Sequence, residues 1–238
     1  MSEEFSFLKR GTESLNLSLS DDVLEKFLYY KQLVTEMNRR LNLTAITDSR
    51  KFTELHIIDS LSIFKFISPH SSLIDIGSGA GFPGIILKAA LPELELTVLD
   101  SHKKKLDFIE EACAKTGLYG VNFVHARAED AAAVPAYREK FDTAAARAVA
   151  ALPQLCEYCI PFVRTGGRFI AMKGSAAEKE IADAGGAHAL LGCSDPEIFD
   201  TELFDSKAQR KILVYRKVRS TPLQYPRKQK FIKNSPLY

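Results

Sequence analysis

The sequence has no apolar run of the roughly 18 residues that a membrane-spanning helix needs. Its first ten residues include Glu3 and Glu4 and lack the apolar stretch of a secretory signal. We therefore expect a cytoplasmic protein with no membrane partner. With 238 residues, of which 46% are apolar and 26% charged, the composition is that of a globular protein. It excludes a disordered, collagen-like or coiled-coil chain.

Cysteine is scarce, with four residues in the whole chain. Cys156 and Cys159 form a Cys-x-x-Cys pair, but there is no second pair near it and no histidine at ligand spacing. The pair follows Pro153 in a helical apolar pattern, which predicts buried thiols, and we expect no metal site. The Gly-x-Ser-x-Gly elbow of α/β-hydrolases is also missing, which disfavours a hydrolase.

Acidic residues are absent from residues 206–238, which contain ten of the 32 basic residues. The rest of the chain, with 22 basic and 30 acidic residues, is acidic on balance. Four aromatic residues are interleaved with the basic ones, namely Tyr215, Tyr225, Phe231 and Tyr238. Phosphates pair with cations and bases stack on aromatic rings, so this composition favours an RNA partner. A solvated basic tail is the alternative.

The first part of the chain has helical patterns. Ser20 is a predicted N-cap, followed by an amphipathic helix of about five turns that reaches Leu41. A second helical pattern covers about 52–66. Residues 1–19 show little periodicity, and we expect them to be loosely ordered.

From residue 72 onward, short apolar runs alternate with helical patterns. The predicted strands are 72–76, 94–99, 121–125, 141–146 and 168–172, and the predicted helices lie near 83–90, 103–116, 152–163 and 175–184. This alternation predicts an α/β fold with a doubly wound, mostly parallel sheet. Two late runs, 197–204 and 211–218, predict an antiparallel pair. We divide the chain into an N-terminal helical extension packed on the core (1–70), a Rossmann-like core (71–218) and a basic C-terminal tail (219–238).

The most specific motif is a glycine-rich loop, Asp75-Ile-Gly77-Ser-Gly79-Ala-Gly81-Phe-Pro83-Gly84, between a predicted strand and a predicted helix. Glycines permit tight turns and the close approach of a ligand to the main chain. Asp100 ends the next strand at the same edge of the sheet, where a carboxylate can accept both hydroxyls of a ribose. The loop and Asp100 together predict a site for an adenosine-containing cofactor.

Two cofactors fit this loop. Gly79, Gly81 and Gly84 match the dinucleotide pattern Gly-x-Gly-x-x-Gly, which keeps a nicotinamide-dependent oxidoreductase as an alternative. Asp75 would repel a pyrophosphate but attract the cationic groups of S-adenosylmethionine, so its charge favours the methyl donor. A non-catalytic RNA-binding protein is a further alternative, disfavoured because Asp75, Asp100 and Arg147 occur together.

The pattern at 75–81 with Asp100 resembles the class I methyltransferases. Over about residues 20–238 the chain also resembles the glucose-inhibited division protein B family, whose members are small-subunit ribosomal RNA guanine-N7 methyltransferases. The motifs that carry this resemblance are Asn42-Leu-Thr44, Glu54-Leu-His56-Ile-Ile-Asp59-Ser60, Gly81-Phe-Pro-Gly84, Arg147-Ala-Val-Ala150, Lys173-Gly174 and Tyr225-Pro-Arg227.

The resemblance implies a class I methyltransferase fold and S-adenosylmethionine-dependent methylation of 16S ribosomal RNA, alone or in the small subunit. It implies that Gly77 and Phe82 line the cofactor site, that Gly79 and Gly81 complete the loop, that Ala128 and Glu129 hold the adenine and that Asp100 holds the ribose. Arg147 would lie next to the reactive methyl group as the catalytic residue. Candidate substrate-binding residues are Asn42, His56, Lys173 and Arg227. We take a monomer as the default.

Guanine N7 carries no proton at neutral pH, so it can attack a methyl sulfonium without a general base. Direct in-line transfer then depends mainly on alignment of the reactants. On the substrate side, Arg147 could bind guanine O6 or a neighbouring phosphate. The alternative for Arg147 is a structural ion pair with Asp142 or Glu129, and for His56 a packing or capping role.

Overall fold

A computed structural model describes residues 2–238, and its centre is a seven-stranded sheet with the order β3-β2-β1-β4-β5-β7-β6. The strands are β1 (Ser72–Ile76), β2 (Glu95–Asp100), β3 (Val121–His125), β4 (Phe141–Arg147), β5 (Val163–Lys173), β6 (Glu197–Glu202) and β7 (Gln209–Arg216). Strands β1 to β5 pair in parallel, whereas β7 is antiparallel to both β5 and β6. The predicted fold class, a mostly parallel doubly wound sheet with a late antiparallel pair, is confirmed.

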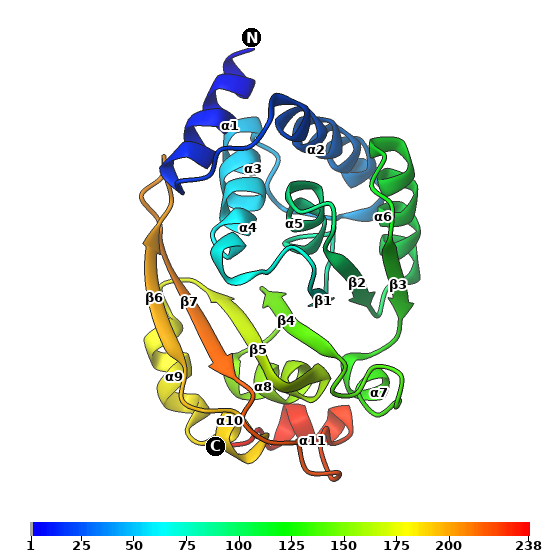
Figure 1. The fold of residues 1–238 in the computed structure, drawn as a ribbon, viewed down its shortest axis with the longest axis vertical. Coiled ribbons are helices and arrows are strands. Elements are labelled where there is room, and N and C mark those ends of the chain that lie inside the picture. Colours follow the sequence, from blue (N-terminus) through cyan, green and yellow to red (C-terminus); the bar gives the residue numbers. More distant parts are fainter. Residues whose placement is uncertain (1) are drawn as a thin grey trace.

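Helices cover both faces of this sheet (Figure 1). One face carries α1 (Glu3–Ser14), α2 (Asp21–Leu41), α3 (Ser49–Phe52), α4 (Asp59–Leu61), α5 (Gly84–Ala90) and α6 (Lys103–Thr116). The other carries α7 (Ala128–Ala131), α8 (Leu152–Cys159), α9 (Ala177–Ala184), α10 (Ala187–Leu190) and α11 (Gln229–Asn234). Two apolar clusters fill the two layers, because alternate residues of each strand point to opposite faces. Leu73 belongs to one cluster and Ile74 to the other.

The N-terminal segment differs from the sequence-based expectation. Residues 3–14 form a helix rather than a loose segment, with Ser2 Oγ accepting a hydrogen bond from the amide of Phe5; residue 1 lies outside the described residues. The buried side chains of Phe5, Phe7 and Leu8 stabilise α1 against the rest of the chain. Its sequence is mostly polar, so tertiary packing rather than periodicity determines this helix.

The predicted helix over 52–66 is also interrupted. A π-helical turn covers Thr53–Ile58, α4 follows, and a 3₁₀ turn covers Phe64–Phe66. Such turns occur often at functional sites. Here the turn carries Leu55 and His56, which both line a large cavity.

The basic residues of 206–238 do not form a free arm. Arg210, Lys211 and Arg216 pair with acidic side chains of the folded body, and Lys217 is buried beside Glu139. Asp59 and Glu139 lie far away in the sequence, and the partners of Lys211 and Arg216 lie on the neighbouring strand β6, so the charge pattern alone did not indicate these pairs. Within residues 2–238, no helix combines the length and apolar character needed to cross a membrane.

Candidate active site

A cavity of about 1120 Å³ lies at the carboxyl ends of the parallel strands, over the point where the chain switches from β1 to β4. This is where doubly wound sheets bind ligands. Its volume exceeds the roughly 300–1,000 Å³ of most small-molecule sites, so it has room for a cofactor and a nucleobase together. Nine of the predicted site residues line it: His56, Gly77, Gly79, Phe82, Asp100, Ala128, Glu129, Arg147 and Lys173. Asp75, Gly81, Asn42 and Arg227 do not.

Six amides of the glycine-rich loop are already hydrogen-bonded within the protein. The amides of Gly77 and Ser78 donate to the carbonyl of Leu99 at 2.8 and 3.2 Å. The amides of Gly81 and Phe82 donate to the carbonyl of Ser78 at 2.8 and 3.1 Å. The amide of Gly79 donates to Asp100 at 3.0 Å, and that of Gly84 to Asp75 at 2.9 Å. A loop that cradles a pyrophosphate offers such amides to the ligand. These amides are occupied, so the geometry disfavours the dinucleotide alternative.

Helix α2 fixes the outer side of this loop. The Tyr30 hydroxyl donates to the carbonyl of Ala80 at 2.8 Å, and Tyr30 is 1% exposed. Gly81 has a φ of +90°, and a Cβ there would collide with the Tyr30 hydroxyl, so only glycine fits. Gly81 is therefore required for packing beneath the loop, away from the cavity.

Asp75 lies under the loop, fully buried. Its Oδ2 accepts from the Gly84 amide, and its Oδ1 is the one buried side-chain N or O atom in the described residues without a hydrogen-bond partner. Burial raises the pKa of Asp75 to about 7. The predicted direct attraction between Asp75 and a cationic cofactor therefore does not fit the structure, and Asp75 supports the loop from below.

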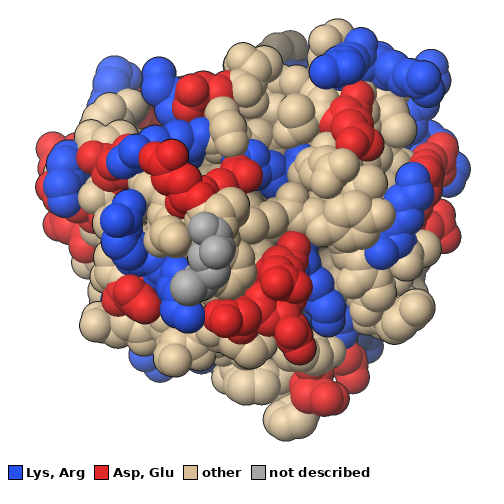
Figure 2. Space-filling model, turned by 90° about the horizontal axis from the view of Figure 1, so that it is seen from above, with Lys and Arg blue, Asp and Glu red and all other residues tan. Residues whose placement is uncertain are grey.

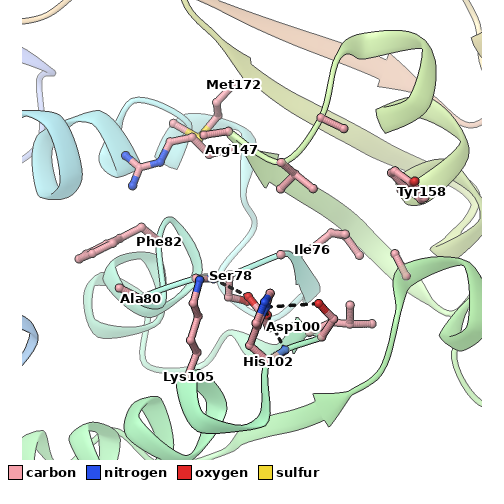
Figure 3. Close-up of a pocket in the computed structure, with 18 of the residues that line it drawn as sticks. Ile76, Ser78, Ala80, Phe82, Asp100, His102, Lys105, Arg147, Tyr158 and Met172 are labelled. Atoms are coloured by element: carbon pink, nitrogen blue, oxygen red, sulfur yellow. Dashed lines mark hydrogen bonds and ion pairs between the residues drawn. The ribbon is translucent and has the colours of Figure 1, made fainter. Parts of the chain in front are cut away.

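Asp100 ends β2 and faces the cavity (Figure 3). Its Oδ2 accepts from the Gly79 amide at 3.0 Å, and its Oδ1 accepts from the His102 amide at 2.8 Å and lies 2.9 Å from His102 Nδ1. Oδ2, which has one protein donor, can accept a second hydrogen bond. Asp100 thus keeps acceptor capacity for a ligand while the loop fixes its orientation.

Arg147 ends β4 and lies at the opposite side of the close-up from Tyr158 (Figure 3). Its NH1 donates to Asp59 Oδ2 at 2.9 Å and to the Leu55 carbonyl at 2.8 Å. Asp142 and Glu129, the ion-pair partners considered as the alternative for Arg147, do not pair with it; Asp142 binds Arg164 and Ser72 instead. Asp59 comes from the N-terminal helices, and its Oδ1 also accepts from Arg210 Nε at 3.2 Å.

His56 is fixed by contacts on both ring nitrogens. Arginine only donates, so Nδ1 accepts from Arg147 NH2 at 3.1 Å, and Nε2 carries the proton that it donates to Thr44 Oγ1 at 2.8 Å. The ring stacks on Phe82, with centroids 4.8 Å apart. Burial, and then the charge of Arg147, lowers the pKa of His56 to about 3. His56 is therefore a neutral support for Arg147.

Two further predicted site residues line the cavity, the acid Glu129 and the cation Lys173, and their surroundings differ. Glu129 follows β3 in α7, and burial raises its pKa. Lys173 ends β5, where its Nζ donates to Glu180 at 2.7 Å and to the Ala150 carbonyl at 2.8 Å. Lys173 thus belongs to the cavity wall with its charge already paired.

The other candidate substrate residues lie outside the cavity lining. Asn42 is exposed and ends α2 in the left-handed conformation, as a turn residue would. Arg227 forms a bidentate pair with the buried Glu157 of α8. Cys156 and Cys159 are buried as predicted, burial raises the pKa of both thiols, and residues 2–238 contain no group of His, Cys, Asp and Glu suited to a metal ion.

Sequence reasoning missed Tyr30, Asp59 and Arg210 as contributors to the site. Tyr30 looked like one more apolar position of an amphipathic helix. Asp59 lies in a motif quoted for the family resemblance, yet nothing local indicated that it joins Arg147 to Arg210. Only the position of Arg210 near the start of an antiparallel strand, hence near the carboxyl edge of the sheet, could have indicated its place.

The family comparison and the individual relatives indicate the same protein family. A family described as "rRNA small subunit methyltransferase G" matches residues 23–203. A ribosomal RNA small subunit methyltransferase G of Alkaliphilus oremlandii is 45% identical over 223 residues, which cover 93% of each chain. One from Acetivibrio thermocellus is 44% identical over 222 residues, 93% of this chain and 91% of the relative.

Solved structures show the same fold at low sequence identity. A geranyl diphosphate methyltransferase, solved in complex with S-adenosylmethionine, superposes with a TM-score of 0.53 and 14% identity over 74% of this chain and 92% of that one. The likeness establishes a class I methyltransferase fold for this chain.

Proposed function

The chain belongs to the ribosomal RNA small subunit methyltransferase G family, and on that premise we propose that it transfers a methyl group from S-adenosylmethionine to N7 of one guanine in 16S ribosomal RNA. The observation that carries the choice of cofactor is the glycine-rich loop with its occupied amides. Because six loop amides are engaged, the loop offers few donors to a pyrophosphate, whereas S-adenosylmethionine has no phosphate to place. The proposed substrate puts the protein in the cytoplasm.

The residues of the cavity fit this cofactor. Asp100 would accept the ribose hydroxyls, and the backbone at Gly77 and Gly79 allows close approach. Ala128 and Glu129 would hold the adenine, and Phe82 would pack near the transferred group. When bound, S-adenosylmethionine supplies an electrophilic methyl group on a positively charged sulfur.

Arg147 provides the orientation on the substrate side. Its contacts with Asp59, Leu55 and His56 determine where its remaining N–H groups point. We propose that these groups bind guanine O6 or the adjacent phosphate and leave N7 free to attack. Orientation of this kind can contribute up to about 7–11 kcal/mol to lowering the barrier.

The chemistry needs no general base, and the geometry is consistent with that. N7 has a free lone pair and loses no proton when it is methylated. The histidine nearest Arg147 is His56, and both of its ring nitrogens are engaged. With a pKa of about 3 it is a poor proton acceptor at neutral pH. Direct in-line transfer is therefore the mechanism that these residues support best.

Transfer of a radiolabelled methyl group tests this function. Small ribosomal subunits from a strain that lacks the modification are incubated with the protein and labelled S-adenosylmethionine, with naked 16S ribosomal RNA in parallel. We expect label in the RNA of at least one of the two substrates. Cofactor binding without transfer to either would favour a non-catalytic RNA-binding protein, and calorimetric binding of NAD would favour the oxidoreductase.

A further inference from the structure

The buried carboxylate of Glu157 has a single cationic partner among the described residues. Glu157 lies on α8 with its side chain 0% exposed. Arg227 donates to it from its backbone amide at 2.7 Å, from Nε at 2.9 Å and from NH2 at 2.7 Å. An unpaired buried carboxylate is strongly unfavourable, so this pair ties the C-terminal segment to α8.

The same segment is packed as well as paired. Helix α11 lies beside α8 (Figure 1), and its Ile232 is completely buried. The Gln154 side chain donates to the carbonyl of Lys233 at 3.5 Å. Leu237, beyond the helix, is also buried. The last residues of the chain are therefore part of the folded body.

Helix α11 also contributes to the wall of the cavity. Gln229 and Lys233 line it together with Glu129 and Tyr158. Tyr158 lies across the close-up from Arg147 (Figure 3), so the wall that α11 forms is at the end of the cavity remote from Arg147. Burial raises the pKa of Glu129, and Lys233 is one of the cations that oppose this effect.

We propose that the Arg227–Glu157 pair seats α11 as a wall of the adenine end of the cofactor site, which makes Arg227 a positioning residue for cofactor binding. This rests on the proposed function, because Glu129 is assigned to the adenine there. A preformed wall lowers the entropy lost when the site becomes ordered around the cofactor. Releasing α11 therefore weakens cofactor affinity and leaves the end of the cavity at Arg147 unchanged.

The test compares Arg227→Gln with wild-type protein, using calorimetric binding of S-adenosylmethionine and steady-state kinetics on small ribosomal subunits. We expect the Kd and the KM for S-adenosylmethionine to rise about tenfold, with kcat at saturation within about twofold of wild type. Hydrogen exchange of residues 229–234 should become faster. Arg227→Lys should restore part of the affinity, because lysine keeps the charge but not the bidentate geometry.

Two further variants complete the test. Phe231→Ala changes an exposed α11 side chain and should leave the Kd unchanged. If Arg227→Gln fails to fold, Lys233→Gln keeps the pair intact and should still weaken binding by about threefold. An unchanged Kd despite released α11, an unchanged Kd in Lys233→Gln, or a change confined to the KM for RNA overturns the inference. Wild-type protein that binds no S-adenosylmethionine overturns the proposed function and this inference with it.

Discussion

Asp59 and Arg147 form an ion pair, 2.9 Å between Oδ2 and NH1, across 88 residues of sequence. The aspartate side chain is 6% exposed and the arginine 13%. The second carboxylate oxygen, Oδ1, accepts from Arg210 Nε. One carboxylate from the N-terminal helices thus orients two guanidinium groups at the carboxyl edge of the sheet. Because Arg147 and Arg210 both line the cavity, Asp59 determines how two cations face it.

Replacing Asp59 with asparagine should misplace both arginines. We expect kcat to fall on the order of 10²-fold, because small displacements of orienting groups have effects of this size. The KM for S-adenosylmethionine should change little, since the proposed adenine end of the cavity lies away from Asp59. Steady-state kinetics with varied cofactor concentration measures both.

Asp142→Asn is a matched control for Asp59→Asn. Asp142 also accepts hydrogen bonds from an arginine, Arg164, but it lies outside the cavity lining. Its replacement should lower the melting temperature with kcat unchanged. Equal losses of kcat in the two variants would show that any lost ion pair harms this protein, and would contradict the role given to Asp59.

Tyr30→Phe tests whether the N-terminal helices position the cofactor loop. The variant leaves the buried carbonyl of Ala80 without its donor, which should lower the free energy of unfolding by about 1–2 kcal/mol. It should also raise the Kd for S-adenosylmethionine, measured by calorimetry. Tyr29→Phe alters the exposed neighbour and should change neither quantity. If Tyr30→Phe is destabilised but binds S-adenosylmethionine with unaltered affinity, α2 does not position the loop for cofactor binding.

His56 should remain neutral throughout the working pH range. Its folded-state pKa of about 3 lies below the ordinary 6.5, so protonation favours unfolding. The stability that neutral His56 provides is present above pH 6.5 and is lost as pH falls from 6.5 towards 3. NMR of the ring protons should show no titration between pH 5 and 8, and His56→Gln should flatten the pH dependence of stability in the acid range. A ring that titrates near pH 6.5 would refute this.

Asp100 and Asp75 should differ in their effect on cofactor binding. Asp100 faces the cavity, so Asp100→Asn should raise the Kd for S-adenosylmethionine about tenfold, equivalent to about 1.4 kcal/mol. Asp75 lies beneath the loop, so Asp75→Asn should change the Kd by less than about threefold when compared at equal folded fraction. The reverse order would restore the direct role that the sequence suggested for Asp75.

Local patterns predicted much of the fold. Strand–helix alternation and the loop at 75–84 predicted where the strands lie along the chain, a mostly parallel sheet with a late antiparallel pair, and the edge of the sheet where the cavity lies. These features depend on periodicity and on glycine, both of which can be seen within short windows of sequence. Helix α1 could not be found this way, because burial of Phe5, Phe7 and Leu8 stabilises it.

The contacts between distant segments could not be predicted. For Arg147 the alternative to a substrate contact was an ion pair with Asp142 or Glu129, but its partner in the structure is Asp59. Arg227 looked like a substrate residue within a basic tail, yet it binds Glu157. Each ion pair joins two elements that only the tertiary fold brings together. The separation of the two residues along the sequence therefore does not indicate the pair.

The most direct test of the account is identification of the methylated nucleoside. RNA from small ribosomal subunits that lack the modification is methylated by the purified protein with labelled S-adenosylmethionine, digested to nucleosides and separated by chromatography with mass detection. Transfer to guanine N7 predicts label in 7-methylguanosine, at one site per 16S ribosomal RNA. Label in any other nucleoside would contradict transfer to guanine N7.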